Sequence, residues 1–294
     1  MWMMKKMKEF KIQLKDPHQD YDFMEYIGSG TFGTVYKAKI CKTGQLAAIK
    51  AIRCTSINYI WAVLESTIMN DIHHKNVTRL TGRYYWNEHL YLCMELCGGG
   101  DLKSLCKETG PLTEQQVAYV ARELLLALDS VHKKGFMHRD VKPGNIFLND
   151  DGEKNATKRV GTARPDRAYN QKCDVWSVGI TLIILARGQC PHFYIGPQCV
   201  SRLLSNLESQ KFKSWSTEFR SFLKAALTKN PEMRPTVEEL LQFDFLRNLH
   251  IEKSPLKKRI QEYKALKKGH DLNDNKVTGS NLIYYQFAHE KDTE

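Results

Sequence analysis

Two segments of the sequence carry residue types suited to chemistry on phosphate groups. The first, Gly28-Ser-Gly-Thr-Phe-Gly33, spaces three glycines so that backbone amides can approach a triphosphate without obstruction by side chains. The second, His138-Arg-Asp140, offers a carboxylate that could take a proton from an attacking hydroxyl group. Together they predict phosphoryl transfer, although a plain hairpin turn would explain the glycines equally well on their own.

Two charged residues between these segments strengthen the interpretation. Lys50 falls on the strand predicted after the glycines, and Glu65 lies on the following predicted helix. A strand lysine aimed at phosphates needs a carboxylate to hold it in place. Two such charges alone would indicate solvated surface, but Lys142 and Asn145 follow Asp140 at a spacing that fits the same chemistry. The order of all these parts indicates one catalytic unit.

Hydrophobic periodicity predicts a small lobe rich in strands at the start of the chain. A turn signal separates most neighbouring strands, and the glycine segment joins the first two into a hairpin that can fold over a ligand. The expected strands are residues 23–27, 34–40, 46–52, 80–86 and 90–96, with one helix at 60–72.

The pattern becomes helical after Gly98-Gly-Gly100. Thr113 and Gln116 form a capping box ahead of an amphipathic helix. Residues 174–187 are apolar nearly all round, which predicts a buried helix. Further helices are expected at residues 200–207, 219–227 and 237–245. The sequence therefore predicts an α+β fold with a strand-rich lobe at about 21–96, a helical lobe at about 101–248, a basic leader at 1–20 and a charged tail at 249–294.

The catalytic-loop spacing is that of the protein kinases, and residues 21–245 resemble that family throughout. The resemblance is strongest to the sterile-20-like, germinal-centre group, the MAP kinase kinase kinase kinases. The segments that carry it are Ile27-Gly-Ser-Gly-Thr-Phe-Gly33, Leu46-Ala-Ala-Ile-Lys50, Cys93-Met-Glu-Leu-Cys-Gly-Gly-Gly100, Thr109-Gly-Pro-Leu-Thr-Glu114 and Leu227-Thr-Lys-Asn-Pro-Glu-Met-Arg-Pro-Thr236. The resemblance implies a bilobal protein kinase domain over residues 21–248.

The resemblance also implies an ATP site between the lobes. Met94 would lie behind the adenine, the backbones of Glu95 and Cys97 would bond to its edge, and Asp101 could reach the ribose. Val35 and Ala48 would cover the adenine from above and Phe147 from below, although core packing alone would also place apolar residues there. The expected nucleotide contacts are Ile27, Gly28, Ser29, Gly30, Thr31, Phe32, Gly33, Thr34, Val35, Ala48, Lys50, Met94, Glu95, Cys97, Asp101 and Phe147.

The implied catalytic roles centre on the loop after residue 138. Asp140 would accept the proton of a serine or threonine hydroxyl, Lys142 would lie near the transferred phosphate, and Asn145 would hold one magnesium ion. Asp174, at the start of the buried helix, would anchor the backbone of the loop. The expected catalytic residues are Asp140, Lys142, Asn145, Lys50 and Glu65.

One part of the kinase pattern is missing from this sequence. The family continues after its catalytic asparagine through a strand into Asp-Phe-Gly, whose aspartate is the principal magnesium ligand, then a long activation loop and Ala-Pro-Glu. Here Asp151-Gly152-Glu153 runs into Lys-Asn-Ala-Thr and contains no Asp-Phe-Gly. Without a gap, that triplet would fall on Lys158-Arg159-Val160.

A second alignment explains the same residues better. Val160-Gly161-Thr162 matches the end of the family's activation loop, and Arg164-Pro165-Asp166 stands in the place of Ala-Pro-Glu. A block of some tens of residues would then be absent between Glu153 and Thr157, with further shortening around Ala163. A skipped exon or a faulty gene model would produce such a break.

The break predicts a weakened magnesium site, because Asn145 alone provides a neutral ligand where the ion prefers charged oxygens. One hypothesis is that Lys158, near the phosphates, neutralises ATP directly. Arg234, which normally pairs with the glutamate of Ala-Pro-Glu, has Asp166 as its evident substitute. The lost phenylalanine would have packed between the lobes, so the helix at 60–72 loses a support.

Three functions remain open on the sequence. The first is a serine/threonine protein kinase that acts on a protein substrate, as in a MAP kinase cascade. The second is a pseudokinase or scaffold that binds nucleotide or a partner without turnover. The third is a truncated product that folds poorly, because the lost block contributes a strand and packing between the lobes.

Composition excludes several other classes. The longest apolar run is too short to cross a bilayer, and the start of the chain lacks the apolar core of a signal peptide. The 8 cysteines contain no Cys-x-x-Cys pair, which predicts reduced thiols in the cytoplasm. The formal charge of +11 favours acidic partners, but no basic stripe with interleaved aromatics indicates nucleic acid. Residues 257–264 are expected to form a short exposed helix.

Overall fold

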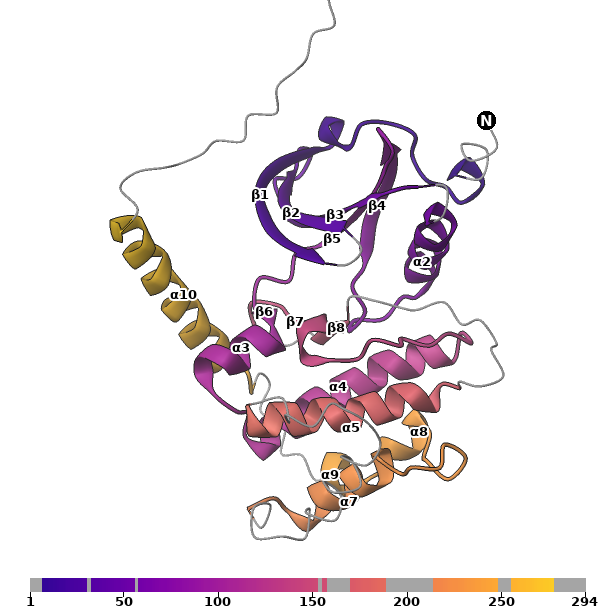
Figure 1. Cartoon of the computed structure of the whole chain (residues 1–294), viewed down its shortest axis with the longest axis vertical. Helices are drawn as coiled ribbons and strands as arrows, with labels where there is room; N and C mark the ends of the chain where they lie inside the picture. Colours follow the sequence, from indigo (N-terminus) through magenta and orange to yellow (C-terminus); the bar gives the residue numbers. More distant parts are fainter. Residues whose placement is uncertain are drawn as a thin grey trace, which may run out of the picture.

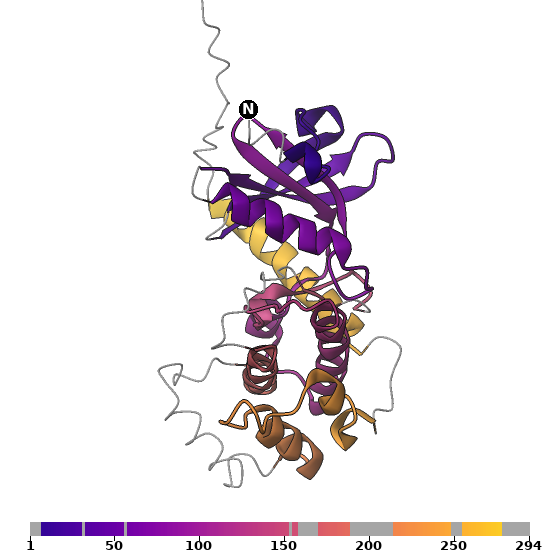
Figure 2. The same ribbon diagram turned by 90° about the vertical axis from the view of Figure 1, so that its right-hand side faces the viewer.

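The computed structural model describes residues 7–30, 33–55, 58–152, 155–157, 170–188, 214–247 and 255–277. They form a lobe rich in strands and a lobe rich in helices, joined by the segment around residues 96–100 (Figures 1 and 2). The division into two lobes is the one predicted from the sequence. Among the described helices, none is long and apolar enough to cross a membrane.

The smaller lobe is built on a five-stranded antiparallel sheet with the order β1-β2-β3-β5-β4. All five strands predicted from the sequence are present. Helix α2 (Tyr59–Asp71) lies against the sheet (Figure 1). The strands are β1 (Tyr21–Gly30), β2 (Gly33–Ile40), β3 (Leu46–Arg53), β4 (Leu80–Trp86) and β5 (His89–Glu95).

Each face of this sheet has its own core, because successive residues of a strand point to opposite sides. Ile49 and Cys93, which are paired across β3 and β5, belong to an outer cluster with Tyr21, Ala38, Ala47 and Tyr84. Ile52 and Leu92, on the other face, belong to a cluster that includes residues of α2. The inner face is the one that Lys50 shares, since Lys50 lies opposite Leu92.

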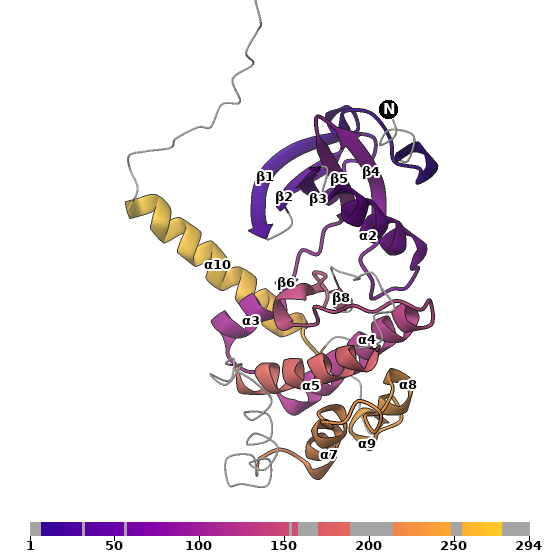
Figure 3. The same ribbon diagram turned by 45° about the vertical axis from the view of Figure 1, so that its right-hand side comes forward.

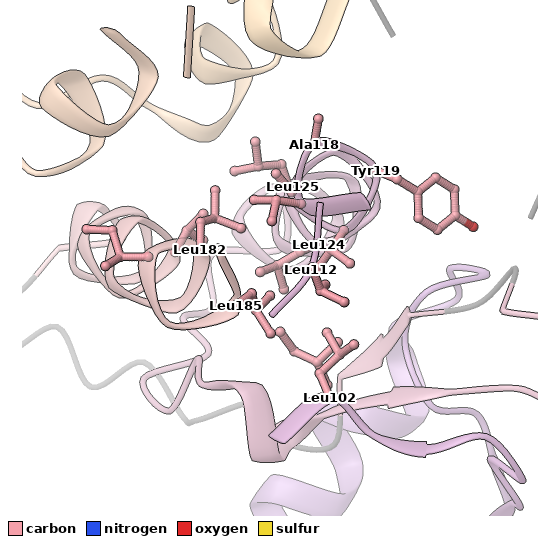
Figure 4. Close-up of a cluster of buried hydrophobic side chains, with 14 of the residues drawn as sticks. Leu102, Leu112, Ala118, Tyr119, Leu124, Leu125, Leu182 and Leu185 are labelled. Atoms are coloured by element: carbon pink, nitrogen blue, oxygen red, sulfur yellow. The ribbon is translucent and has the colours of Figure 1, made fainter. Parts of the chain in front are cut away.

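The larger lobe is organised around two long helices, α4 (Glu114–His132) and α5 (Lys172–Arg187). The predicted capping box of Thr113 and Gln116 is confirmed at the start of α4. Leu124 and Leu125 of α4 meet Leu182 and Leu185 of α5 in one continuous core (Figure 4). The shorter helices of this lobe are α3 (Leu102–Thr109), α7 (Thr217–Ala226), α8 (Val237–Leu240) and α9 (Asp244–Arg247).

Two of the predicted helices differ in outcome. The stretch at 237–245 contains a break, so that α8 and α9 are separate short helices with a turn between them. The helix predicted at 200–207 lies outside the described residues. Short elements complete the part of the chain that the structure describes: η1 (Pro17–Gln19), η2 (Pro143–Asn145), β6 (Gly100–Asp101), β7 (Ile146–Leu148) and β8 (Asn155–Thr157).

Helix α10 (Lys257–Val277) is longer and better packed than the short exposed helix expected from the sequence. It runs beside α3 and rises away from the helical lobe (Figures 1 and 3). Leu256, Ile260 and Tyr263 are buried in the same core as α4 and α5. Their spacing puts them on one side of the helix, so the charged composition of this segment hides an apolar stripe.

The packing of α10 leads to a test of its contribution to stability. Ile260→Ala should lower the free energy of unfolding by about 2–5 kcal/mol, because Ile260 is fully buried and alanine leaves a cavity. Gln261→Ala, at an exposed position of the same helix, should change it by less than about 0.5 kcal/mol. Urea unfolding of both variants measures the difference, and equal midpoints would show that α10 does not dock in solution.

Candidate active site

The glycine segment forms the hairpin between β1 and β2. Gly28 lies opposite Val35, Ser29 opposite Thr34, and Gly30 opposite Gly33. The remaining two predicted contacts of this segment, Thr31 and Phe32, lie outside the described residues. The hairpin is therefore present as expected, with Ile27 45% exposed just before it.

Two of these glycines differ in their surroundings. Gly33 has a φ of 132°, and a Cβ there would overlap with the carbonyl oxygen of Ala51 on β3. Gly28 has no heavy atom within 4 Å of the place where its Cβ would lie. The close approach of Gly33 holds β2 against β3, whereas Gly28 leaves open space beside the hairpin.

The inner face of the sheet brings together the residues expected to surround the adenine and the phosphates. Val35 lies opposite Lys50 and Ala48 lies opposite Met94. Directly paired residues share a face of an antiparallel sheet, so these four side chains form one surface. Val35, Ala48 and Met94 are buried, and Met94 also packs against helices α2 and α4. Glu65 lies on α2, but its side chain is outside the described residues, so its pairing with Lys50 stays a prediction.

The segment that joins the lobes contains the three predicted contacts Glu95, Cys97 and Asp101. Glu95, opposite Ala47, donates its backbone N–H to the carbonyl of Arg79 at 3.3 Å. The carbonyl of Cys97 accepts from the N–H of Gly100 at 3.3 Å. The turn so formed sets the direction of the chain between the lobes.

Asp101 has a structural task in addition to its predicted contact with ribose. Its carboxylate accepts the backbone N–H of Ser104 at 2.9 Å and the Ser104 hydroxyl at 2.7 Å, which caps the start of α3. Asp101 is also paired with Phe147 across β6 and β7. Phe147, which is expected below the adenine, therefore lies beside Asp101, which is expected to contact the ribose. The ribose contact itself stays a prediction.

The three catalytic residues predicted on the loop contact one another. Lys142 Nζ lies 2.9 Å from Asp140 Oδ1, and Asn145 Nδ2 donates to Asp140 Oδ2 at 2.8 Å. Asn145 also donates to the backbone carbonyl of Asp140 at 2.8 Å. The Asp140 side chain is 32% exposed, so a substrate hydroxyl can reach it. A carboxylate held by two partners and open to solvent is suited to accept a proton in a defined place.

Asp174 anchors this loop from below, which confirms its predicted role. The backbone N–H groups of His138 and Arg139 each donate to its carboxylate at 2.7 Å, and His132 Nε2 lies 2.8 Å from Oδ2. Burial raises the pKa of Asp174, but the hydrogen bonds of His132 and His138 outweigh it and hold the pKa below its ordinary value. His132 was not predicted as part of the site. The only indication of it in the sequence is a histidine at the end of the helix predicted before the loop.

Arg234 is buried and stacks on Trp176 of α5, with Cζ 4.9 Å from the ring centroid. It donates to the backbone carbonyls of Lys172 at 2.7 Å and Thr228 at 3.0 Å. Its predicted partner Asp166 lies outside the described residues. The guanidinium therefore has backbone acceptors that fix its position independently of that pairing.

A strand follows β7 in spite of the break in the sequence pattern. Asn155–Thr157 form β8, which pairs antiparallel with β7 so that Ile146 lies opposite Thr157 and Leu148 opposite Asn155. Lys158 comes directly after this strand in the sequence. Lys158 and the following residues through 169 lie outside the described residues. The segments that the second alignment matches, Val160-Gly161-Thr162 and Arg164-Pro165-Asp166, are among them.

The predicted magnesium ligand Asn145 lies beside Asp140. Asn145 has its amide nitrogen turned to Asp140, which leaves one neutral oxygen for a metal. In the described ranges, no group of three or more His, Cys, Asp or Glu side chains is placed to hold a metal ion. Magnesium binds best with charged oxygen ligands, and the weak site expected from the sequence stays a prediction.

The arrangement of hairpin, strand lysine and anchored loop is that of a protein kinase. A model of the protein kinase domain matches residues 21–161 and 162–246, so the chain belongs to this family, and the predicted bilobal α+β fold is confirmed. Members of the family use ATP with Mg²⁺ and act on proteins. The two matches adjoin at Gly161 and Thr162, close to the predicted break.

Curated relatives narrow the class to the sterile-20-like, germinal-centre group, as predicted. The chain is 41% identical to mitogen-activated protein kinase kinase kinase kinase 3 of Rattus norvegicus over 269 residues, which covers 81% of this chain and 31% of that protein. It is 34% identical to serine/threonine-protein kinase 10 of Homo sapiens over 283 residues, or 85% of this chain and 29% of that protein. The chain thus spans about three tenths of the length of these relatives.

The alignments themselves contain a gap on the side of this chain. The alignment with the rat kinase runs over 269 residues but includes 81% of the 294 residues here, or about 238. About 30 aligned positions of that relative therefore face no residue in this chain. The alignment with the human kinase runs over 283 residues and includes 85% of this chain, or about 250 residues. About 30 positions of that relative also face no residue here.

The two glycines of the hairpin should respond differently to alanine. Gly33→Ala should lower the free energy of unfolding by more than about 1 kcal/mol, because its φ and the Ala51 carbonyl exclude a Cβ. Gly28→Ala should leave stability within about 1 kcal/mol and weaken ATP binding instead, because its Cβ enters the space expected for phosphates. Thermal unfolding and nucleotide titration separate the two, and a stable Gly33→Ala protein would contradict this account of the hairpin.

The depressed pKa of Asp174 predicts how stability depends on acid. A carboxylate whose folded pKa lies below its unfolded value stabilises the fold above the unfolded pKa, and this contribution is lost as pH falls through the folded pKa. Asp174→Asn should therefore be less stable than wild type at pH 7, by about 1–3 kcal/mol, and should lose less stability between pH 5 and 3. Urea unfolding at several pH values gives the change of unfolding free energy with pH for the wild type and for Asp174→Asn. The same change in both proteins would mean that Asp174 does not cause the pH dependence.

Proposed function

We propose that this chain transfers the γ-phosphate of ATP to serine or threonine hydroxyls of proteins. The observation that carries the proposal is the Asp140 carboxylate, held between Lys142 and Asn145 above the Asp174 anchor. The serine/threonine character is supported by Lys142 and by the names of the relatives, which are serine/threonine and MAP kinase cascade kinases.

In this mechanism the substrate oxygen attacks the γ-phosphorus while the bond to the β-phosphate oxygen breaks and ADP leaves. The hydroxyl proton passes to Asp140, whose second oxygen is fixed by Asn145. Lys142, whose Nζ lies 2.9 Å from Asp140 Oδ1, offers its ammonium group to the transferred phosphate. The inner face with Lys50 and Ala48 would hold the nucleotide under the glycine hairpin.

Magnesium supplies charge neutralisation of the phosphates in this family, and we infer that it binds weakly here. Three observations support the inference: the sequence lacks Asp-Phe-Gly, about 30 positions of the relatives have no counterpart, and the two family matches adjoin at residues 161 and 162. Turnover should therefore be slow relative to an intact kinase. A nucleotide-binding domain without turnover is the second candidate, and the same missing aspartate favours it.

For the substrate and the setting we propose a protein kinase of a MAP kinase cascade in the cytoplasm. The relatives' names support the cascade, and the scattered cysteines support a reducing compartment. Neither the basic charge nor the site geometry calls for nucleic acid, since the positive residues form no stripe with aromatic side chains.

Transfer of labelled γ-phosphate from Mg-ATP to a basic protein substrate tests the function. Asp140→Asn should lower the rate by about 10²-fold or more, because the general base is lost. Asp22→Asn makes the same chemical change at an exposed position of β1 and should leave the rate as in wild type.

The three proteins together separate the candidate functions. Transfer by wild type and by Asp22→Asn, but not by Asp140→Asn, would establish a kinase that works without the family's metal ligand. ATP binding without transfer in all three would identify a nucleotide-binding domain. Equal transfer by all three would mean that Asp140 is not the base.

A further inference from the structure

Residues 7–14, which precede the family match at residue 21, are packed against the smaller lobe. A helical turn at residues 7–9 lies next to α2 (Figures 1 and 3). Met7 is fully buried and Ile12 is 3% exposed. They share a cluster with residues of three elements of the lobe: Tyr59, Ala62 and Val63 of α2, Ile52 of β3, and Leu90 and Leu92 of β5.

The backbone of this segment continues the sheet. Gln13 donates its N–H to the carbonyl of Arg83 at 2.9 Å, and its own carbonyl accepts the N–H of Tyr85 at 2.8 Å. This is a parallel bridge at the edge of β4, centred on Tyr84. The bonds fix the register of the segment, so Met7 and Ile12 are held over α2 by more than apolar contact.

The buried side chain of Arg83 forms hydrogen bonds to both the segment and α2. Arg83 is 7% exposed; its Nη2 donates to the carbonyl of Phe10 at 2.7 Å and its Nη1 to Thr67 Oγ1 of α2 at 3.2 Å. A buried guanidinium is costly to leave without acceptors. Displacing the segment would remove the Phe10 acceptor and disturb the bond to the helix.

The elements that carry Lys50 and Glu65 both contribute residues to this cluster. Lys50 lies two residues from Ile52 on the same face of β3 and directly opposite Leu92. Glu65 lies on α2, the helix whose residues Tyr59, Ala62 and Val63 belong to the cluster. The cluster that residues 7–14 complete therefore contains residues of β3, which carries Lys50, and of α2, which carries Glu65.

We propose that residues 7–14 are a positioning element that holds α2, and with it Glu65, in place against Lys50. The inference rests on the proposed function, because it concerns the same phosphate site. It gives the segment a specific task in a chain that lacks Asp-Phe-Gly, since the missing phenylalanine would have supported α2 from between the lobes. Here the support comes from Met7, Ile12 and the Arg83 bonds.

Binding of ATP and of adenosine to the full chain tests this role. Met7→Gln places a polar amide in the apolar cluster and should weaken ATP binding about tenfold, while adenosine, which has no phosphates, changes less than about twofold. Lys8→Gln introduces the same side chain at the exposed neighbouring position and should change neither affinity. Met7→Leu keeps an apolar side chain of similar volume and should retain wild-type ATP binding.

A second measurement needs no nucleotide. Amide hydrogen exchange of the full chain should show faster exchange in α2 for Met7→Gln than for Lys8→Gln, by about tenfold, with α4 unchanged. Unchanged exchange in α2, or equal losses of ATP and adenosine affinity, would overturn the positioning role. If the chain transfers no phosphate but α2 responds as expected, the proposed function fails while the positioning role stands.

Discussion

The geometry of the active site depends on one buried carboxylate. Asp174 lies at the start of α5, 1% exposed, and accepts the backbone N–H groups of His138 and Arg139. Arg139 has a φ of 66°, in the left-handed region that non-glycine residues seldom adopt, and these bonds hold it there. Because Asp140 comes next in the chain, its direction is set by this anchor. The placement of α5 therefore also determines the placement of Asp140, the expected proton acceptor.

The smaller lobe shows how one sheet can serve two purposes. Its inner face carries Val35, Ala48 and Lys50, which are expected to contact the nucleotide, and also Ile52 and Leu92, which join the cluster with α2. Both sets follow from the alternation of side chains along the strands. A steric change at Ile52 or Leu92 therefore lies within two residues of Lys50 or directly opposite it.

Local patterns made much of this structure predictable from the sequence. The five strands, α2 and the capping box at Thr113 follow from periodicity and capping chemistry, which act over short distances. The catalytic loop was predictable because its spacing is specific. The anchor at Asp174 followed from the same resemblance, and the structure supplies its bonds.

The rest depends on partners distant in the sequence. Met7 and Ile12 stand among lysines, and nothing local shows that β4 offers an edge to Gln13. Asn155–Thr157 have no strand pattern and form β8 because β7 provides the hydrogen bonds. Leu256, Ile260 and Tyr263 are correctly spaced for a helix, but their burial requires the surface of the larger lobe.

Helix α10 contacts the segment that joins the two lobes. A Cβ at Gly100 would lie 3.0 Å from the ring of Tyr263, Lys257 lies 3.3 Å from Asp151, and Lys264 is paired with Asp150 beside Gly98. Arg259 adds hydrogen bonds to the connection between α3 and α4, including one to Pro111 at 2.6 Å. By thermodynamic reciprocity, a ligand that alters the packing of Gly100 must change the docking equilibrium of this helix, and undocking must change the ligand's affinity by the same factor.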